Sequence, residues 1–243
     1  MNKSSTFIAL LLFSCSHFSY AEQVPWKLWK KNSWQSVSYR PALINKQSDK
    51  KLIEIKASAT VSSTMSGFLL FLQDVNNTQH WLVNASESKI IKQYSTNESS
   101  FYIKLSQIWP LKPRILILNS SYWQNDDLSI EIKLTDAEPI LLKSTTPLAI
   151  ERLDDFLKIK THSAQWKIIP KLSEDEDSEI FIEYIFIADG RGDTPKWLAD
   201  HLALKSIWKS MRNIRRQLPK EKWQQKKIKG ITELSVIPLT DKP

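Results

Sequence analysis

The stretch that decides the fold runs from residue 179 to residue 218 and reads EIFIEYIFIADGRGDTPKWLADHLALKSIWKSMRNIRRQL. Its first ten residues, 179–188, are rich in Ile, Phe and Tyr, a composition typical of a β-strand. Thr194 then offers a helix N-cap and Pro195 a favourable first helical position. Large apolar side chains follow at spacings of three and four, and they are Trp197, Leu204, Ile207, Trp208, Met211, Ile214 and Leu218. This pattern predicts one long amphipathic helix directly after a strand.

The chain before this stretch is dominated by strand patterns. Residues 53–62 alternate between apolar and polar side chains, which predicts a strand with one wet face. Polar turns at residues 96–98 and 125–127 lie between apolar runs and predict two hairpins. Further strands are expected at residues 26–29, 36–39, 89–94, 99–105, 114–123, 128–134, 156–161 and 164–169, with short helices at 64–72 and 76–82. Many antiparallel strands followed by one C-terminal helix predict an α+β fold, with the helix on the concave face of the sheet.

Composition excludes several classes of protein. The 243 residues are 42% hydrophobic and 25% charged, which is unlike a disordered chain or a multi-span membrane protein. One cysteine excludes a disulfide framework and any Cys-rich metal site. The four histidines show no His-Glu-x-x-His spacing, and no nucleophile elbow is present. We therefore expect no metal, no cofactor and no catalytic residues, and we expect a protein that is not an enzyme.

The first 21 residues have the layout of a secretory signal peptide. Lys3 supplies a positive charge, residues 7–13 are apolar, and Ser19-Tyr20-Ala21 ends in a small residue. This pattern predicts export to the periplasm and a main domain at residues 22–219. Residues 12–15 loosely resemble a lipobox, so lipoprotein processing at Cys15 stays open as the alternative.

Several motifs, taken in order, resemble the START (StAR-related lipid-transfer) domain family. The opening segment ends in the aromatic-Arg pair Tyr39-Arg40, and Pro113-Arg114 is similar to the beginning of a family strand. The stretches that carry the resemblance are residues 26–41, 68–81, 109–114, 166–170 and 181–198. Three positions depart from the family pattern: Ile115 stands where an Asp is usual, Ala164 replaces a Gly, and Arg191 splits a glycine pair.

The resemblance implies a helix-grip fold, in which a curved antiparallel sheet wraps around a long C-terminal helix and leaves a tunnel for one lipid. Burying such a ligand would yield about 0.8 kcal/mol per CH₂ group. Arg114 is the polar group that we expect inside, where a ligand phosphate or carboxylate would balance its charge. The alternative is that Arg114 reaches the surface or pairs with a distant carboxylate. The apolar candidates for ligand contact are Trp81, Trp109, Trp166, Trp197, Leu204, Trp208 and Met211, although large side chains of this kind more often fill a core.

Positive charge is concentrated near the C-terminus. The formal net charge is +8, yet residues 205–229 alone carry ten basic residues and one acidic residue. Lys205, Lys209, Arg212 and Arg216 share one helix face, which predicts contact with an anionic membrane surface. The alternative is a solvated helix face. Nucleic acid is not an expected partner, because no nucleic-acid-binding motif is present and an exported protein rarely meets it.

Residues 220–243 form a basic C-terminal tail that the sequence leaves open as loose or partly docked. The favoured function is binding or transfer of one lipid or similar hydrophobic molecule. Two other functions stay open, an enzyme with polar groups in the same cavity and an envelope adaptor with a filled cavity. The oligomeric state and the ligand are not determined by the sequence.

Overall fold

The structure is a computed structural model that describes residues 24–44, 51–107, 111–138, 155–172 and 178–234. The predicted signal peptide, Cys15 and Trp109 lie outside these residues. The strands are β1 (Lys27–Lys31), β2 (Gln35–Pro41), β3 (Ile53–Ser62), β4 (Ala85–Gln93), β5 (Glu98–Leu105), β6 (Arg114–Gln124), β7 (Ile130–Asp136), β8 (Leu157–Lys158), β9 (Lys160–Lys171) and β10 (Glu179–Asp189). The helices are α1 (Met65–Gln73), η1 (Val75–Asn77), α2 (Thr78–Trp81), α4 (Lys196–Gln217) and α5 (Glu221–Gln224).

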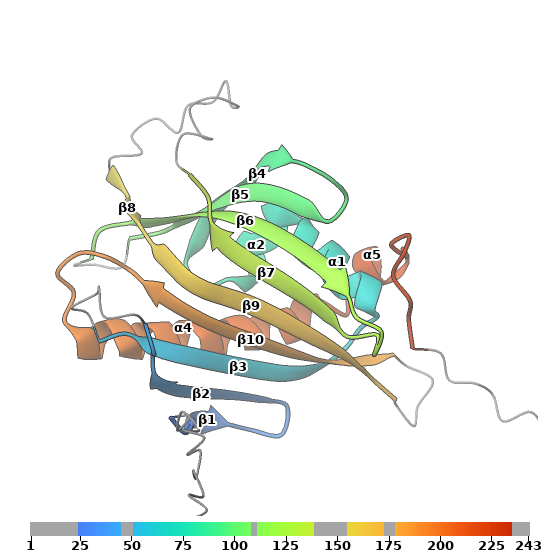
Figure 1. The fold of residues 1–243 in the computed structure, drawn as a ribbon, viewed down its shortest axis with the longest axis horizontal. Coiled ribbons are helices and arrows are strands. Elements are labelled where there is room, and N and C mark those ends of the chain that lie inside the picture. Colours follow the sequence, from blue (N-terminus) through green and yellow to red (C-terminus); the bar gives the residue numbers. More distant parts are fainter. Residues whose placement is uncertain (1–23, 45–50, 108–110, 139–154, 173–177, 235–243) are drawn as a thin grey trace, which may run out of the picture.

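The strands form one curved antiparallel sheet in the order β1-β2-β3-β10-β9-β7-β6-β5-β4, and β8 pairs parallel to β6. The long helix α4 lies across one face of this sheet (Figure 1). It packs mainly on β3 and β2, and α2 lies against it. The architecture confirms the predicted α+β helix-grip fold.

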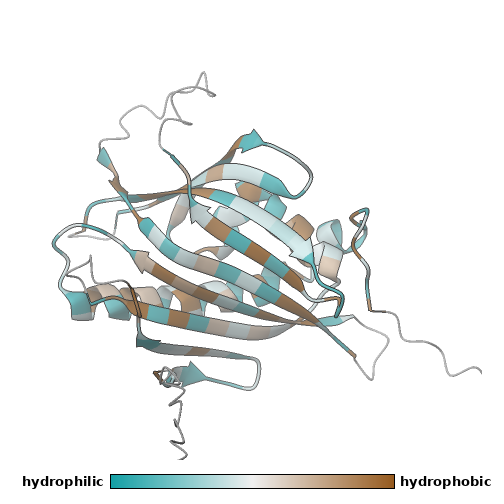
Figure 2. Ribbon diagram, in the orientation of Figure 1, coloured by the Kyte–Doolittle hydropathy of each residue, from teal (hydrophilic) through white to brown (hydrophobic). Residues whose placement is uncertain are grey.

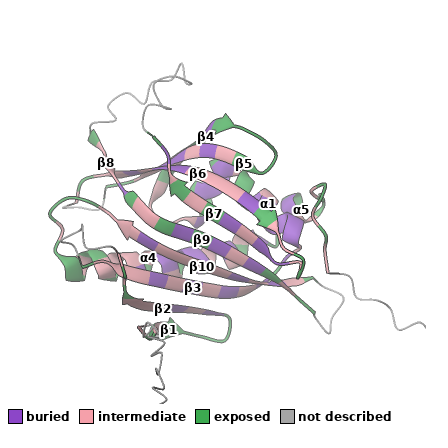
Figure 3. Ribbon diagram, viewed as in Figure 1, coloured by how far each residue is buried: buried purple, intermediate pink, exposed green. Residues whose placement is uncertain are grey.

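Alternating side chains give the central strands one dry face. On β3 the side chains of Ile55, Ala57, Ala59 and Val61 are buried, and the polar residues between them are more exposed. Hydropathy and burial alternate in the same way along the neighbouring strands (Figures 2 and 3). The apolar face of the sheet packs with α1, α2 and α4 into the main core, as the period-2 pattern predicted.

Strand β9 is continuous where the sequence indicated two strands. Its pairing with β10 passes from Ile187 opposite Ser163 to Ala188 opposite Thr161. His162 is therefore the extra residue of a β-bulge. A bulge interrupts the alternation of faces, which explains why the pattern suggested a break at residues 162–163.

Helix α4 buries the stripe that the sequence indicated, with two differences at its start. Leu204, Ile207, Met211 and Ile214 are buried, but Trp197 is 72% exposed. The first turn of α4, which contains Trp197, extends past the ends of the strands (Figure 1). The N-cap residue is Pro195 rather than Thr194, because the Thr194 hydroxyl accepts a hydrogen bond from Arg114 instead.

Helix α1 begins at the predicted cap. Thr64 is the N-cap, and its hydroxyl oxygen accepts a hydrogen bond from the Gly67 amide at 2.9 Å. The other free amides of this first turn are satisfied from the far end of the chain. Glu233 accepts from the amides of Met65 at 2.7 Å and Ser66 at 2.8 Å. A carboxylate at a helix N-terminus also interacts favourably with the helix dipole.

Residues 220–234 thus form an arm, which we call the C-terminal arm, that lies against the fold. Trp223 of α5 is only 4% exposed and meets the Phe71 ring edge-on at 4.9 Å. The Gln224 carboxamide oxygen accepts from the Thr64 amide at 3.0 Å. The described part of the predicted tail is therefore docked on α1.

A second, smaller core lies on the opposite face of β5 and β6. It consists of Ile91, Tyr102, Ile115, Ile117 and Ala137, with Phe156 packed against it. Beside it, Glu87 accepts hydrogen bonds from the Tyr102 hydroxyl at 2.6 Å and from Lys104 at 2.7 Å. The hydrogen bond from Lys104, followed by that from Tyr102, lowers the pKa of Glu87 from 4.5 to about 2.

This network predicts acid sensitivity. A carboxylate with a lowered folded-state pKa stabilises the fold above its unfolded pKa, and this stabilisation is lost as the pH falls from about 4.5 through about 2. We expect Glu87→Gln to flatten the pH dependence of the free energy of unfolding in that window. Urea denaturation between pH 2 and 7 measures it, with Glu98→Gln on an exposed position as the control. An unchanged slope for Glu87→Gln would contradict the assignment.

Candidate functional site

A cavity of about 470 Å³ lies between α4 and the inner face of the sheet. Most of its wall is apolar, and its volume is in the range typical of small-molecule sites. The strands contribute Ile53 and Ile55 from β3, Leu116 and Leu118 from β6, and Tyr184 and Phe186 from β10. Helix α4 therefore does not cover the apolar face of the sheet completely, and the uncovered part borders a mostly apolar cavity.

The helix wall of the cavity includes a row of small side chains. Ala199, Ala203, Ser206 and Ser210 all line it, and they recur at spacings of four, three and four, so they share one face of α4. Small residues on this face leave space that Leu or Phe would occupy. The sequence analysis did not predict this stripe, because Ala and Ser side chains are too small to stand out beside the large apolar residues next to them.

Arg114 lines the cavity from the beginning of β6. Its Nε donates to the Gly190 carbonyl at 2.9 Å, one terminal nitrogen donates to the Lys112 carbonyl at 3.0 Å, and the other to the Thr194 hydroxyl at 3.2 Å. Burial lowers the pKa of the guanidinium. The donors that we expected to face a ligand anion are thus taken up by the turn between β10 and α4 and by the Lys112 carbonyl.

The same turn explains the sequence around Arg114. A Cβ on Gly190 would lie 3.2 Å from Arg114 Nε, so glycine permits the close approach. Ile115, which stands where START domains usually have an Asp, is buried in the second core. Its side chain therefore packs away from the guanidinium, and backbone carbonyls replace the missing acid.

We expect Arg114→Gln to loosen this turn. Hydrogen bonds to a charged group contribute about 1.5–3 kcal/mol, and a glutamine cannot reach the same three acceptors. Chemical denaturation should show a loss of about 2 kcal/mol, and hydrogen exchange should become faster at residues 189–195. Arg216→Gln, on an exposed position of α4, is the control. Unchanged exchange in the turn would show that Arg114 does not hold it.

The aromatic candidates fill the core or lie at the surface rather than lining the cavity. Trp81 packs on Phe71, and Trp208 meets Trp29 edge-on. Trp166 stacks behind Tyr184 at 4.3 Å. The cavity wall also omits Trp197, Leu204 and Met211. Arg114 is thus the one predicted ligand residue in the described part of the chain that borders this space.

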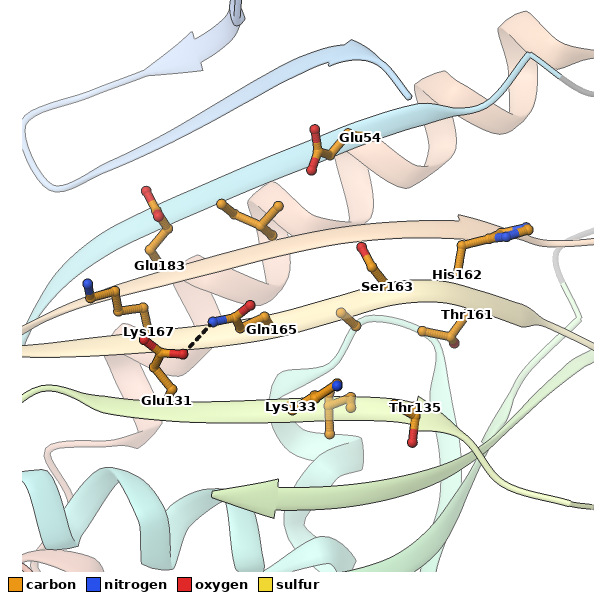
Figure 4. A pocket seen from close by; sticks show the side chains of 13 residues that line it. Glu54, Glu131, Lys133, Thr135, Thr161, His162, Ser163, Gln165, Lys167 and Glu183 are labelled. Atoms are coloured by element: carbon orange, nitrogen blue, oxygen red, sulfur yellow. Dashed lines mark hydrogen bonds between the residues drawn. The ribbon is translucent and has the colours of Figure 1, made fainter. Parts of the chain in front are cut away.

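A second hollow, of about 590 Å³, lies on the outer face of β3, β10, β9 and β7. Figure 4 shows its polar side chains standing on the sheet, with α4 behind them. Two of its carboxylates already have partners: Gln165 donates to Glu131 at 2.8 Å within the hollow, and Arg40, which lies beside it, pairs with Glu54 at 2.5 Å. This is the pattern of the solvated face of an antiparallel sheet, so the internal cavity is the better candidate site.

The cavity shows none of the groupings that metal chemistry needs. Across the described ranges, no three His, Cys, Asp or Glu side chains come together in a way that could hold a metal ion. No helix among these residues is both long and apolar enough to span a bilayer.

The basic residues expected at a membrane all face solvent. Lys205, Lys209, Arg212 and Arg216 are exposed on α4, and none of them forms an ion pair with another described residue. We call these four residues the basic stripe. On the helix they lie on a different face from the small residues that line the cavity.

Comparison with known proteins identifies solved structures of similar architecture. No family model matches the sequence, and no curated protein matches it either. Among solved structures, the StAR-related lipid transfer protein of Xanthomonas axonopodis is similar over 80% of this chain and 99% of its own, with 21% identity and a TM-score of 0.62.

Two human proteins are similar to the same extent. STARD10 matches with a TM-score of 0.63 and 20% identity, over 82% of this chain and 76% of its own. Human StAR-related lipid transfer protein 5 matches with a TM-score of 0.58 and 16% identity, over 81% and 87%. At these identities the likeness establishes architecture. Together with the sheet that curves around α4, it shows that this chain has the START (StAR-related lipid-transfer) domain fold.

Proposed function

We propose that this protein binds one lipid or similar hydrophobic molecule in the cavity between α4 and the sheet, and that it carries the molecule without altering it chemically. The observation that carries the proposal is the 470 Å³ space with its mostly apolar wall. A well-packed core rarely contains a void larger than a water molecule. Empty cavities destabilise the fold around them. We therefore expect a ligand that fills this apolar space to stabilise the protein.

Native mass spectrometry of protein purified without detergent from its own host tests the proposal. We expect one bound hydrophobic molecule per chain. When this molecule is incubated with the protein and recovered by organic extraction, its mass should be unchanged. Recovery of a chemically modified molecule would instead support an enzyme. Failure to bind any hydrophobic molecule, also after incubation with host lipid extract, would overturn the proposal and favour the adaptor.

We also propose that the basic stripe docks on an anionic membrane surface during loading or release. Four cations on one exposed helix face, none of them ion-paired with another described residue, support this, because each Lys or Arg near an anionic bilayer contributes about 1 kcal/mol. The predicted signal peptide supports a periplasmic location for this exchange, with anchoring through Cys15 as the alternative.

Neutralising the basic stripe tests membrane docking. The variant Lys205→Gln, Lys209→Gln, Arg212→Gln and Arg216→Gln should lose most flotation with vesicles containing 30% phosphatidylglycerol, with affinity falling about 30-fold if half of the expected energy is realised. A control variant neutralises four exposed lysines elsewhere, Lys31, Lys92, Lys133 and Lys160, and should float nearly as well as the wild type. Equal loss in both variants would indicate a net-charge effect and contradict a docking face.

A further inference from the structure

Among the described residues that line the cavity, Tyr184 is the one aromatic side chain that carries a hydroxyl group. It lies on β10, where its ring is stacked between Trp166 at 4.3 Å and Phe186 at 4.9 Å. Both contacts are nearly parallel, with interplanar angles of 20° and 24°. The ring is therefore held in one orientation on the inner face of the sheet, and the position of its hydroxyl group is fixed.

This hydroxyl group has no protein partner among the residues that the structure describes. The hydroxyls of two other tyrosines do: Tyr102 donates to Glu87 at 2.6 Å, and Tyr122 to the Thr96 carbonyl at 3.3 Å. The Tyr184 side chain is half-buried, and its hydroxyl would need a hydrogen-bond partner once an apolar ligand enclosed it, because an unsatisfied polar group in an apolar environment is costly. Burial also raises the pKa of Tyr184, so the group stays protonated and remains a donor.

The facing wall of the cavity adds two more hydroxyls. Ser206 lines it from α4 and forms no hydrogen bond within the described residues. Ser210 lines it one turn further along, and its oxygen accepts from the Val83 amide at 3.0 Å, which leaves its proton to donate. From Lys196 to Ser210, α4 rises about 21 Å. Ser210 therefore lies far along the cavity from the charged side chain of Lys196, which also lines it.

We infer that the cavity is built for a hydrophobic molecule that carries a hydrogen-bond acceptor oxygen within its apolar body, and that the Tyr184 hydroxyl donates to this oxygen. The ligand class is thus a long-chain or polycyclic ketone, alcohol, ether or ester rather than a plain hydrocarbon. This inference rests on the proposed function, because it assumes that the cavity is where the ligand lies. A site that presents a donor disfavours the analogue that lacks the acceptor, since the donor is then left unpaired.

A matched pair of probes tests the inference. Both 2-tetradecanone and tetradecane are titrated against protein loaded with the fluorescent neutral probe N-phenyl-1-naphthylamine, and their displacement constants are compared. For each protein, the displacement constant of the ketone is divided by that of the alkane. The readout is this ratio in the wild type divided by the same ratio in Tyr184→Phe, so that the different water solubilities of the two compounds cancel. Loss of one hydrogen bond should change this quotient by roughly three- to tenfold in favour of the ketone.

The control variant is Tyr122→Phe, which removes a hydroxyl that does not line the cavity, and its quotient should stay near one. If both compounds displace the probe and Tyr184→Phe leaves the ratio unchanged, the inference is overturned and the proposed function stands. If neither compound displaces the probe and native mass spectrometry finds no ligand, the proposed function fails as well.

A second measurement needs no variant. The carbonyl stretching band of 2-tetradecanone bound to the wild-type protein should lie at lower frequency than that of the ketone in dry hexane, because a hydrogen bond weakens the carbonyl bond. A band at the hexane position would overturn the inference, also in the case that Tyr184→Phe fails to fold.

Discussion

Replacing Ala203 by Trp should abolish ligand uptake while the protein stays folded. Ala203 lines the cavity in the middle of the small-residue stripe of α4, so an indole at this position would occupy space that the ligand needs. A ligand that loses the burial of about four CH₂ groups loses about 3 kcal/mol, which is roughly 100-fold in affinity. Displacement titration with N-phenyl-1-naphthylamine measures the loss, and circular dichroism reports the fold.

The matched control is Lys209→Trp, which adds the same side chain to the solvent face of the same helix. It should bind like the wild type. Overpacking costs about 1–3 kcal/mol, so Ser206→Leu serves as a milder cavity-filling variant should Ala203→Trp prove unstable. Wild-type affinity in both filled variants would show that the ligand binds somewhere other than this cavity.

Removing the Trp223 side chain should cost about 3–5 kcal/mol of stability. Trp223 is almost fully buried against Phe71, although it lies in a lysine-rich segment that reads as a tail. Its loss would leave a cavity between the C-terminal arm and α1, and would free Gln224 and Glu233 from the helix N-terminus that they satisfy. Guanidinium denaturation of Trp223→Ala measures the change.

A second tryptophan of the same chain provides the matched control for Trp223→Ala. Trp197→Ala removes the same side chain from an exposed position, and surface substitutions of this kind usually change stability by less than about 0.5 kcal/mol. Equal effects of the two variants would mean that the arm does not contribute to the fold. A large effect of Trp223→Ala alone would establish residues 220–234 as part of the domain.

Local patterns in the sequence were sufficient to predict most of the architecture. The alternation of Ile55, Ala57 and Ala59 placed one face of β3 in the core, and the spacing of Leu204, Ile207 and Met211 placed the buried face of α4. Such patterns report which side of an element is dry. They do so because burial of apolar surface is the dominant favourable term in folding.

The same patterns could not separate a dry core from a dry cavity. Trp166 and Tyr184 are both aromatic residues on inward-facing strand positions, yet Tyr184 borders the cavity and Trp166 lies behind it. The difference depends on the curvature of the sheet and on the small residues opposite, Ala203 and Ser206, and these are properties of the assembled fold. Candidate residues chosen for their size were therefore mostly core residues.

Contacts between distant parts of the chain could also not be predicted from the sequence. Nothing near Glu233 indicates that its carboxylate bonds to the amides of Met65 and Ser66, 168 and 167 residues away. Arg114 likewise bonds to the turn at Gly190, 76 residues further on. Each interaction is chemically ordinary, but only the three-dimensional fold brings the partners together.

The pairing of β3 with β10 has a consequence for how this protein acquires its structure. These two strands are adjacent in the sheet although more than a hundred residues separate them, and long-range pairing of this kind slows folding because a large loop must close first. The first helix also receives its final anchor from nearly the last described residues. A nascent chain that lacks β10 and the C-terminal arm would hence expose unpaired strand edges, so cooperative assembly must await the synthesis of these two segments, and chaperones that shield nascent chains should influence the yield.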